Sequence, residues 1–212
     1  MMAKIKPLDN ISVAILAGGK STRMGQNKAL IRIGGKAMIQ RVTDTVQSQA
    51  QDVMIISNQT SAYAFLDLPV HPDAVKNRGP LGGIYTALLH AKHEHCLVLA
   101  CDLPFVTPQL LQFLYENSTQ NDVLVFESET GLEPLCAVYS KRCLEIIRQQ
   151  IDAGQLSVFK LYDKVNTRIV RLNPEQVFYE PTLFMNVNTK QELQRAQAIL
   201  KKTINPKTKK PV

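Results

Sequence analysis

The sequence has few cysteines, and their spacing excludes two common kinds of site. Only four of the 212 residues are cysteine, and no two of them are closer than five positions apart. They are Cys96, Cys101, Cys136 and Cys143. A C-x-x-C redox pair and a zinc-knuckle spacing are therefore both absent. Because 45% of the residues are hydrophobic, the chain can build a substantial core without a disulfide or a metal.

The sequence also lacks a signal peptide and any apolar segment long enough to span a membrane. These two absences predict a soluble protein with no membrane partner. Together with the cysteine pattern, they predict a location in the reducing environment of the cytoplasm.

Acidic residues are missing from the end of the chain, where the positive charge is concentrated. The net charge is +7, but residues 201–212 carry five lysines and no acid, so residues 1–200 hold only +2. This segment also lacks interleaved aromatic side chains on which bases could stack. We therefore expect a basic, flexible tail over residues 201–212 and no nucleic-acid partner.

Short apolar, β-branched runs alternate with helical patterns along the chain. This alternation favours an α/β fold with a mostly parallel sheet between two helical layers. The expected strands cover residues 11–16, 53–57, 68–72, 96–100, 122–126 and 132–139. The expected helices lie near 36–50, 60–66, 81–93, 107–117 and 141–153, with a last helix from Thr189. The stretch 155–185 stays ambiguous, and without a repeat or a linker we expect one domain over residues 1–200.

A glycine-rich turn follows the first expected strand, in the stretch VAILAGGKSTRMGQNK (13–28). Such a turn aims backbone N–H groups at an anion. A Walker A motif is excluded because Ala14 stands five positions before Gly19. A dinucleotide fingerprint is excluded because its G-x-G spacing is missing. Two interpretations remain, a phosphate cradle that includes Arg23 and Lys28, and an ordinary basic surface turn.

Polar residues follow other expected strands and so belong at the same edge of the sheet. Asp102 comes directly after the strand 96–100, and a lone carboxylate there is suited to hold Mg²⁺ on a triphosphate. Asn186 and Asn188 would point to the same side of an extended backbone and could reach one ligand. Asn188 could equally do no more than precede the Thr189 cap.

Three motifs carry a resemblance to a known family. LAGGKSTRMGQNKALIRIGGKAMIQRV is similar to the opening signature of the molybdenum cofactor guanylyltransferases. An aspartate, Asp73, followed by GPLGG, which contains Gly82, resembles their second loop, and FMNVNTKQEL resembles their last motif. The resemblance covers the chain from about Ile11 to Ala198. It implies a three-layer αβα, Rossmann-like nucleotidyltransferase fold.

The resemblance also implies an activity, the Mg²⁺-dependent transfer of GMP from GTP to molybdenum molybdopterin with release of pyrophosphate. It implies catalytic roles for Arg23, Lys28 and Asp102, with Asp102 holding the metal. It implies that Asn186 and Asn188 bind the acceptor. It also implies, as partners, proteins that deliver the acceptor or receive the finished cofactor. The implied nucleotide-binding residues are Leu16, Ala17, Gly18, Gly19, Arg23, Lys28, Asn58, Asp73, Gly82 and Asp102.

Alternatives stay open at this point. The chain could be a cytidylyltransferase or a sugar-phosphate nucleotidyltransferase, although Gly19 and GPLGG favour GTP within the family. It could also be a non-catalytic GTP-binding module. Two positions depart from the family pattern, because Asn27 stands where many relatives have aspartate, and Gln155 stands where many have arginine.

Overall fold

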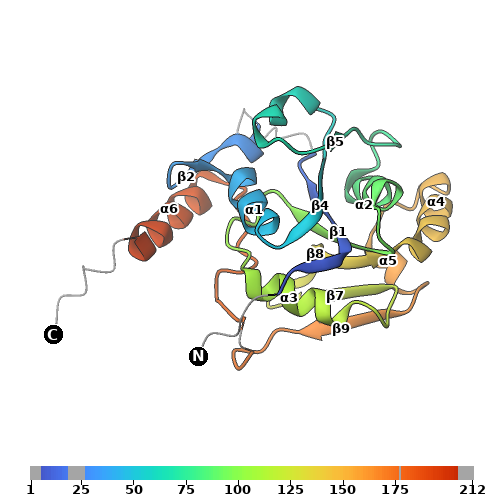
Figure 1. The fold of residues 1–212 in the computed structure, drawn as a ribbon. Coiled ribbons are helices and arrows are strands. Elements are labelled where there is room, and N and C mark those ends of the chain that lie inside the picture. Colours follow the sequence, from blue (N-terminus) through green and yellow to red (C-terminus); the bar gives the residue numbers. More distant parts are fainter. Residues whose placement is uncertain (1–5, 19–26, 177, 205–212) are drawn as a thin grey trace.

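A central sheet covered by helices on both faces forms the body of the protein (Figure 1). The computed structural model describes residues 6–18, 27–176 and 178–204. Within these residues one seven-stranded sheet has the order β5-β4-β1-β6-β8-β7-β9. Its strands are β1 (Leu8–Leu16), β4 (Ala50–Ile56), β5 (Val70–His71), β6 (His95–Ala100), β7 (Val123–Ser128), β8 (Gly131–Ser140) and β9 (Thr167–Arg171). The predicted α/β fold class is confirmed.

The helices and a small hairpin complete the fold. The α-helices are α1 (Met38–Gln47), α2 (Gly79–His90), α3 (Pro108–Asn117), α4 (Leu144–Asp152), α5 (Phe159–Tyr162) and α6 (Lys190–Ile204). The 3-10 helices are η1 (Lys28–Leu30), η2 (Thr60–Leu66) and η3 (Lys141–Cys143). The hairpin consists of β2 (Arg32–Ile33) and β3 (Lys36–Ala37), which pair antiparallel. Among the described residues, no helix is both long enough and apolar enough to cross a membrane.

Strand β1 is the centre of the parallel half of the sheet. It lies between β4 and β6, with Val13 opposite both Val53 and Leu97. Successive side chains of a strand point to opposite faces. Ile15 therefore packs in the core under α1 and α3, whereas Ala14 packs in the core under α2 and α4. Because both faces are covered, β1 is an apolar run rather than an alternation of apolar and polar residues.

The strand order creates a crevice at one edge of the sheet. From β1 the chain moves outward to β4 and β5 on one side, and later returns to place β6 on the other side of β1. In open parallel sheets, ligands bind outside the carboxyl ends of the strands, at the point where the order reverses. Residues 17 and 18, which follow β1, and the loop after β6 flank that point.

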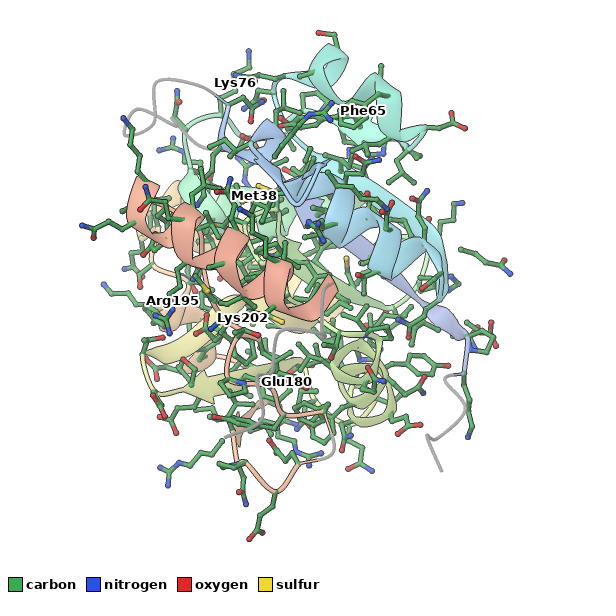
Figure 2. All side chains as sticks on the ribbon, turned by 90° about the vertical axis from the view of Figure 1, so that its left-hand side faces the viewer. Met38, Phe65, Lys76, Glu180, Arg195 and Lys202 are labelled. Atoms are coloured by element: carbon green, nitrogen blue, oxygen red, sulfur yellow. The ribbon has the colours of Figure 1, made fainter. Side chains whose placement is uncertain are left out.

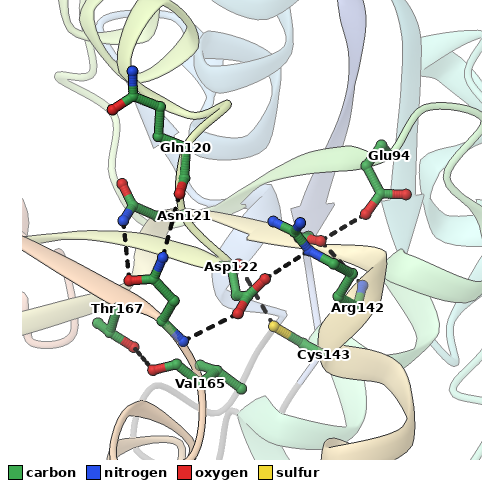
Figure 3. A network of polar contacts seen from close by, with 10 residues as sticks. Glu94, Gln120, Asn121, Asp122, Arg142, Cys143, Val165 and Thr167 are labelled. Carbon is green, nitrogen blue, oxygen red and sulfur yellow. Dashed lines mark hydrogen bonds and ion pairs between the residues drawn. The ribbon is translucent and has the colours of Figure 1, made fainter.

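The far half of the sheet differs from a simple parallel arrangement. β8 runs antiparallel to both β6 and β7, and β9 runs parallel to β7. β9 comes from the stretch 155–185, whose structure the sequence left ambiguous. Its anchor is Asp122 (Figure 3), whose Oδ2 accepts from the Asn166 amide at 3.0 Å and whose Oδ1 pairs with Arg142 Nε at 2.7 Å. These partners are distant in sequence, so local patterns do not reveal the strand.

Two helices begin elsewhere than the sequence predicted. The helix expected from residue 36 begins at Met38, because residues 32–37 form the β2–β3 hairpin. The GPLGG stretch, expected to precede a helix, is the first turn of α2. Pro80 fits that turn because its missing N–H would have no helical partner. Gly79 there has φ +57°, a conformation that other residues rarely adopt.

The last helix, α6, is capped as the sequence predicted and is longer than predicted. Thr189 Oγ1 accepts from the Glu192 amide at 3.2 Å, and Glu192 Oε2 accepts from the Thr189 amide at 2.8 Å, which forms a capping box. The helix continues to Ile204, so the first four residues of the expected tail are helical. Ala196 packs in an apolar cluster with Met38 of α1, on the side of the molecule that Figure 2 faces.

A stacked histidine pair joins β5 to the end of α2. The rings of His71 and His90 lie 3.8 Å apart between centroids and are nearly parallel. Burial, and next His90, lower the pKa of His71, and Asp52 opposes this shift. The unfolded chain therefore binds a proton at His71 more readily than the folded chain does. The free energy of unfolding should fall as the pH drops below about 6.5, the ordinary histidine pKa.

We predict that His71→Gln makes the protein less sensitive to acid. The urea midpoint of the wild type should fall further between pH 7.5 and pH 5 than that of the variant, because glutamine takes up no proton. His93→Gln, at a nearby histidine outside the stacked pair, is the control and should keep the wild-type dependence. Equal pH dependence of the wild type and His71→Gln would contradict the prediction.

Candidate active site at the carboxyl edge of the sheet

A cavity of about 960 Å³ opens at the carboxyl ends of β1, β4 and β6. This volume lies at the upper end of the range for small-molecule sites, roughly 300–1,000 Å³, and leaves room for more than one ligand group. Seven of the residues predicted from the sequence line it, namely Leu16, Ala17, Gly18, Lys28, Asn58, Asp73 and Asp102. The strand order has therefore brought together residues that are as far as 86 positions apart in the sequence.

Hydrogen bonds fix the backbone of Ala17, the first residue after β1. The Ala17 amide donates to Ile56 O at 2.9 Å, and Ala17 O accepts from Ser57 Oγ at 3.0 Å and from Tyr63 OH at 3.2 Å. The Ala17 amide is thus already paired, and it cannot donate to an anion without losing that bond. Gly18 is the first residue beyond these contacts. Gly19 and Arg23, also predicted to bind phosphate, lie outside the described residues.

A lysine joins two oxygen-bearing side chains at the centre of the site. Lys28 Nζ donates to Asp102 Oδ2 and to Asn188 Oδ1. The side chains of Lys28 and Asp102 are 17% and 16% exposed, so this ion pair is largely withdrawn from water and is stronger than a surface pair. The α6 capping box positions Asn188, because Glu192 Oε2 also accepts from the Asn188 amide at 2.6 Å.

This group of side chains offers the donors that a hard divalent cation requires. A carboxylate oxygen and an amide carbonyl oxygen, from Asp102 and Asn188, converge on one positive charge. Mg²⁺ prefers oxygen ligands and completes its shell with water and phosphate oxygens. The residues present therefore fit Mg²⁺. Elsewhere, no group of three or more histidine, cysteine, aspartate or glutamate side chains among the described residues could hold a metal.

Asn58 and Asp73 form a second, reciprocal pair on the β4–β5 side of the cavity. Asn58 Nδ2 donates to Asp73 Oδ2 at 2.7 Å, and the Asp73 amide donates to Asn58 Oδ1 at 3.1 Å. These bonds lock the loops after β4 and β5 to each other. Asp73 Oδ1 makes no further hydrogen bond to the described residues, so it can accept one from a ligand.

Asn27, which departs from the family pattern, has a role that only an amide can fill. Its Nδ2 donates to Gln59 Oε1 at 2.8 Å and to Tyr63 OH at 3.0 Å, while its Oδ1 caps η1 by accepting from the Ala29 amide at 3.1 Å. An aspartate could not make the two donations. Burial is the main cause that raises the pKa of Tyr63, which keeps the phenol neutral. Asn27 therefore places Lys28, the next residue, at the edge of the cavity.

Glycines let α2 approach β1 closely. A Cβ atom on Gly83 would lie 2.9 Å from Leu16 Cδ1, and one on Gly82 would lie 2.8 Å from Arg78 Cβ. Gly83 lines the cavity together with Gly79 and Pro80, whereas Gly82 is buried in α2 away from the lining. The second glycine loop thus contributes through its packing against the floor of the cavity.

Two further predicted positions lie outside the cavity, and several lining residues were not predicted. Asn186 and Asn188 are not among the described lining residues, although Asn188 contacts Lys28, which lines the cavity. The lining residues that sequence reasoning missed include Ser57, Gln59, Asn77 and Leu135. Ser57 and Gln59 flank Asn58, so their position after a strand was an available signal. Leu135 comes from the antiparallel strand β8 and carried no such signal.

Cys101 lines the cavity beside Asp102, but its thiol is unsuited to nucleophilic chemistry. Burial, and next the charge of Asp102, raise the pKa of Cys101 to about 12. The thiolate, which is the reactive form, is therefore scarce near neutral pH. The arrangement can align and neutralise anionic groups, and it offers no activated nucleophile of its own among the described residues.

The chain is similar to proteins from several organisms. The family description "MobA-like NTP transferase domain" matches residues 13–199. A molybdenum cofactor guanylyltransferase of Desulfosudis oleivorans is 37% identical over 198 residues, which are 92% of this chain and 98% of that protein. A probable molybdenum cofactor guanylyltransferase of Carboxydothermus hydrogenoformans is 38% identical over 184 residues, 86% of this chain and 92% of that protein.

A solved structure supports the same likeness. Molybdopterin-guanine dinucleotide biosynthesis protein A from Archaeoglobus fulgidus superposes with a TM-score of 0.79 at 27% sequence identity. The match covers 90% of this chain and 99% of that one. The predicted nucleotidyltransferase fold is therefore confirmed over nearly the whole chain.

The hydroxyl of Tyr63 forms hydrogen bonds that hold the floor of the cavity. Tyr63→Phe should lower the free energy of unfolding by about 1–3 kcal/mol, because the bond to Ala17 O and the bond from Asn27 Nδ2 are both lost, although Ala17 O keeps its bond from Ser57. Urea unfolding measures the loss. Tyr115→Phe is the matched control, since the Tyr115 hydroxyl makes no hydrogen bond to the described residues. A loss no larger than that of the control would contradict the prediction.

Proposed function

Because the chain belongs to the MobA-like NTP transferase family, we propose that it transfers GMP from GTP to molybdenum molybdopterin. The products are the molybdopterin guanine dinucleotide cofactor and pyrophosphate. One observation carries the proposal, the contact of Lys28 with Asp102 and Asn188 at a cavity that Lys28 and Asp102 line and whose other side holds Asn58 and Asp73. Relatives that carry the name of this activity and match over nearly their whole length support it.

The reaction needs no covalent intermediate with the protein. An oxygen of the acceptor's phosphate monoester attacks the α-phosphorus of GTP, and a new P–O bond forms. The bond from that phosphorus to the bridging oxygen breaks, and pyrophosphate leaves with the electron pair. A phosphate monoester is already a nucleophile near neutral pH, so the protein has to align the two substrates and balance their charge.

Asp102 and Asn188 would hold Mg²⁺ through their side-chain oxygens, since these oxygens already converge on one cation. When bound, the ion would stabilise the negative charge that grows on the α-phosphate and on the leaving group. Lys28 supplies a second positive charge at the same place. Gly18 would contribute to a phosphate cradle next to Leu16 and Ala17. Gly19 and Arg23, which lie outside the described residues, are proposed to bind phosphate as well.

The nucleobase would bind on the β4–β5 side, near Asn58 and Asp73. Guanine presents two adjacent N–H donors, at N1 and the 2-amino group, to the free Oδ1 of Asp73. Cytosine has no such pair of donors on its base-pairing edge. The hydrogen bonds between Asn58 and Asp73 keep that carboxylate oriented, which favours GTP over CTP.

We further propose that residues 1–200 form one nucleotidyltransferase domain. The single continuous sheet of the described residues supports this division. Proteins that deliver molybdopterin or receive the finished cofactor are proposed partners, because the acceptor is chemically labile and is best passed on without release.

Pyrophosphate release is the direct test of the proposed function. With Mg²⁺, GTP and molybdopterin together, we expect release that stops when the acceptor, the metal or GTP is left out. Replacing GTP by CTP or ATP should give little release. Release with CTP and not GTP would overturn the guanine assignment. GTP binding without release in the presence of acceptor would instead indicate a non-catalytic GTP-binding module.

We predict that Lys28→Met lowers kcat for guanylyl transfer by about 10²- to 10³-fold, the usual effect of removing one preorganised charge-stabilising group. The methionine keeps the apolar stem and removes the ammonium. Lys36→Met is the matched control, because Lys36 forms an exposed ion pair with Asp44 at 2.6 Å outside the cavity. Steady-state kinetics distinguish the variants. Equal kcat values for both would contradict the role of Lys28.

A further inference from the structure

The cavity extends past Asp102 toward the antiparallel half of the sheet. Leu135 of β8 lines it, and β8 lies on the opposite side of β6 from β4 and β5. Asn58 and Asp73 mark the nucleotide side of the cavity under the proposed function. The acceptor must reach the α-phosphate from elsewhere, and the β8 side is the part of the described lining that the nucleotide leaves available.

The pairing of β6 with β8 brings a second carboxylate to Asp102. Leu99 lies opposite Cys136 in the antiparallel register. β6 ends at Ala100, so the first residues of β8, among them Glu133, extend past that end on the side of the loop that carries Asp102. The electrostatics agree with this placement, because burial and, to a smaller extent, the charge of Asp102 raise the pKa of Glu133.

Local hydrogen bonds hold one oxygen of Glu133 and leave the other available. Ser128 Oγ donates to Glu133 Oε1 at 2.7 Å, and Thr130 Oγ1 donates to the same atom at 3.3 Å. Oε2 makes no hydrogen bond to the described residues. The carboxylate is therefore oriented by the β7–β8 turn and keeps an acceptor atom for a ligand.

The β7–β8 ladder is irregular at this point. Val125 pairs with Ala137, but the next pair along β7 is Glu127 with Leu132, so residues 133–136 face a single residue of β7. Irregularities of this kind redirect side chains and are frequent next to active sites. A half-buried glutamate beside another carboxylate is electrostatically unfavourable, and such groups concentrate at functional sites.

We infer that Glu133 binds the pterin ring of the acceptor by accepting hydrogen bonds from its N–H donors. This inference rests on the proposed function. The 2-amino-4-oxo edge of a pterin presents two adjacent donors, N3–H and the 2-amino group, and the available Oε2 of Glu133 can accept from this edge. The negative charges of Glu133 and Asp102 repel an anion, so the acceptor's phosphate belongs near Lys28 and the neutral, donor-rich ring belongs at Glu133.

The test compares two ring systems on the protein loaded with Mg²⁺ and GTP. The probes are 6-hydroxymethylpterin and 6-hydroxymethyllumazine, in which an oxo group replaces the 2-amino group, and their binding is measured by fluorescence titration. The wild type should bind the pterin at least tenfold tighter than the lumazine. In Glu133→Gln, pterin affinity should fall by about 10- to 100-fold, the range for a hydrogen bond to a charged group, and the preference should disappear.

Two further variants separate ring recognition from loss of structure. Glu127→Gln changes a neighbouring carboxylate of β7, which pairs with Arg171 at 2.7 Å, and should keep the wild-type preference. Glu133→Asp keeps the charge and should restore part of it. Thermal protection by Mg²⁺ and GTP should be the same in Glu133→Gln as in the wild type, because the nucleotide side is unchanged.

Three outcomes would overturn the inference. The first is a pterin preference that survives in Glu133→Gln, and the second is a wild type that binds pterin and lumazine equally. The third is a loss of thermal protection by GTP in Glu133→Gln, which would assign the residue to the nucleotide or the metal. The titration does not depend on turnover, so the two proposals can fail separately. If the protein prefers the pterin to the lumazine only when Glu133 is present, the inference about Glu133 stands even without pyrophosphate release. If the wild type releases pyrophosphate but shows no preference for the pterin, only the guanylyltransferase proposal stands.

Discussion

The site depends on one ammonium group, that of Lys28, held between Asp102 and Asn188. These partners stand 74 and 160 residues further along the chain, so the contact joins the start of η1, the loop after β6 and the entry to α6. Because the ion pair is largely withdrawn from water, its attraction is stronger than that of an exposed pair. The same attraction that orders the site also keeps two oxygen donors together, as binding of a divalent cation requires.

Hydrogen bonds between neutral groups fix the backbone on either side of this contact. Tyr63, Ser57 and Asn27 hold the backbone at Ala17 and cap η1, and none of them adds a charge. Charge is therefore concentrated on groups that face the cavity. Close packing of Gly83 against Leu16 completes a rigid floor. Such preorganisation lets a site stabilise developing charge without first rearranging its own dipoles.

The reversal of strand direction at β8 divides the cavity into two unlike sides. On one side, parallel strands end together and present Asn58 and Asp73. On the other, the antiparallel register carries β8 past the end of β6 and brings Glu133 and Leu135 to the same edge. One side thus suits a nucleotide and the other a second, chemically different substrate, with the cation group between them. In a purely parallel sheet, both sides of the cavity would be formed by the carboxyl ends of strands.

The sequence by itself determined the βα alternation, the position of most strands, and several of the residues that line the cavity, because strand runs, caps and glycine turns depend on neighbouring residues. Asp102 could be predicted since it directly follows a strand, and Lys28 since it belongs to the glycine-rich stretch, whereas Asn58 and Asp73 were implied by the family resemblance. Other features arose from contacts between distant segments. Strand β9 depends on Asp122, the start of α1 depends on the β2–β3 hairpin, and the extension of β8 with Glu133 past the end of β6 depends on the pairing of these two strands. Only the tertiary structure could decide these, because register and long-range pairing leave no periodic signal in the residues that form them.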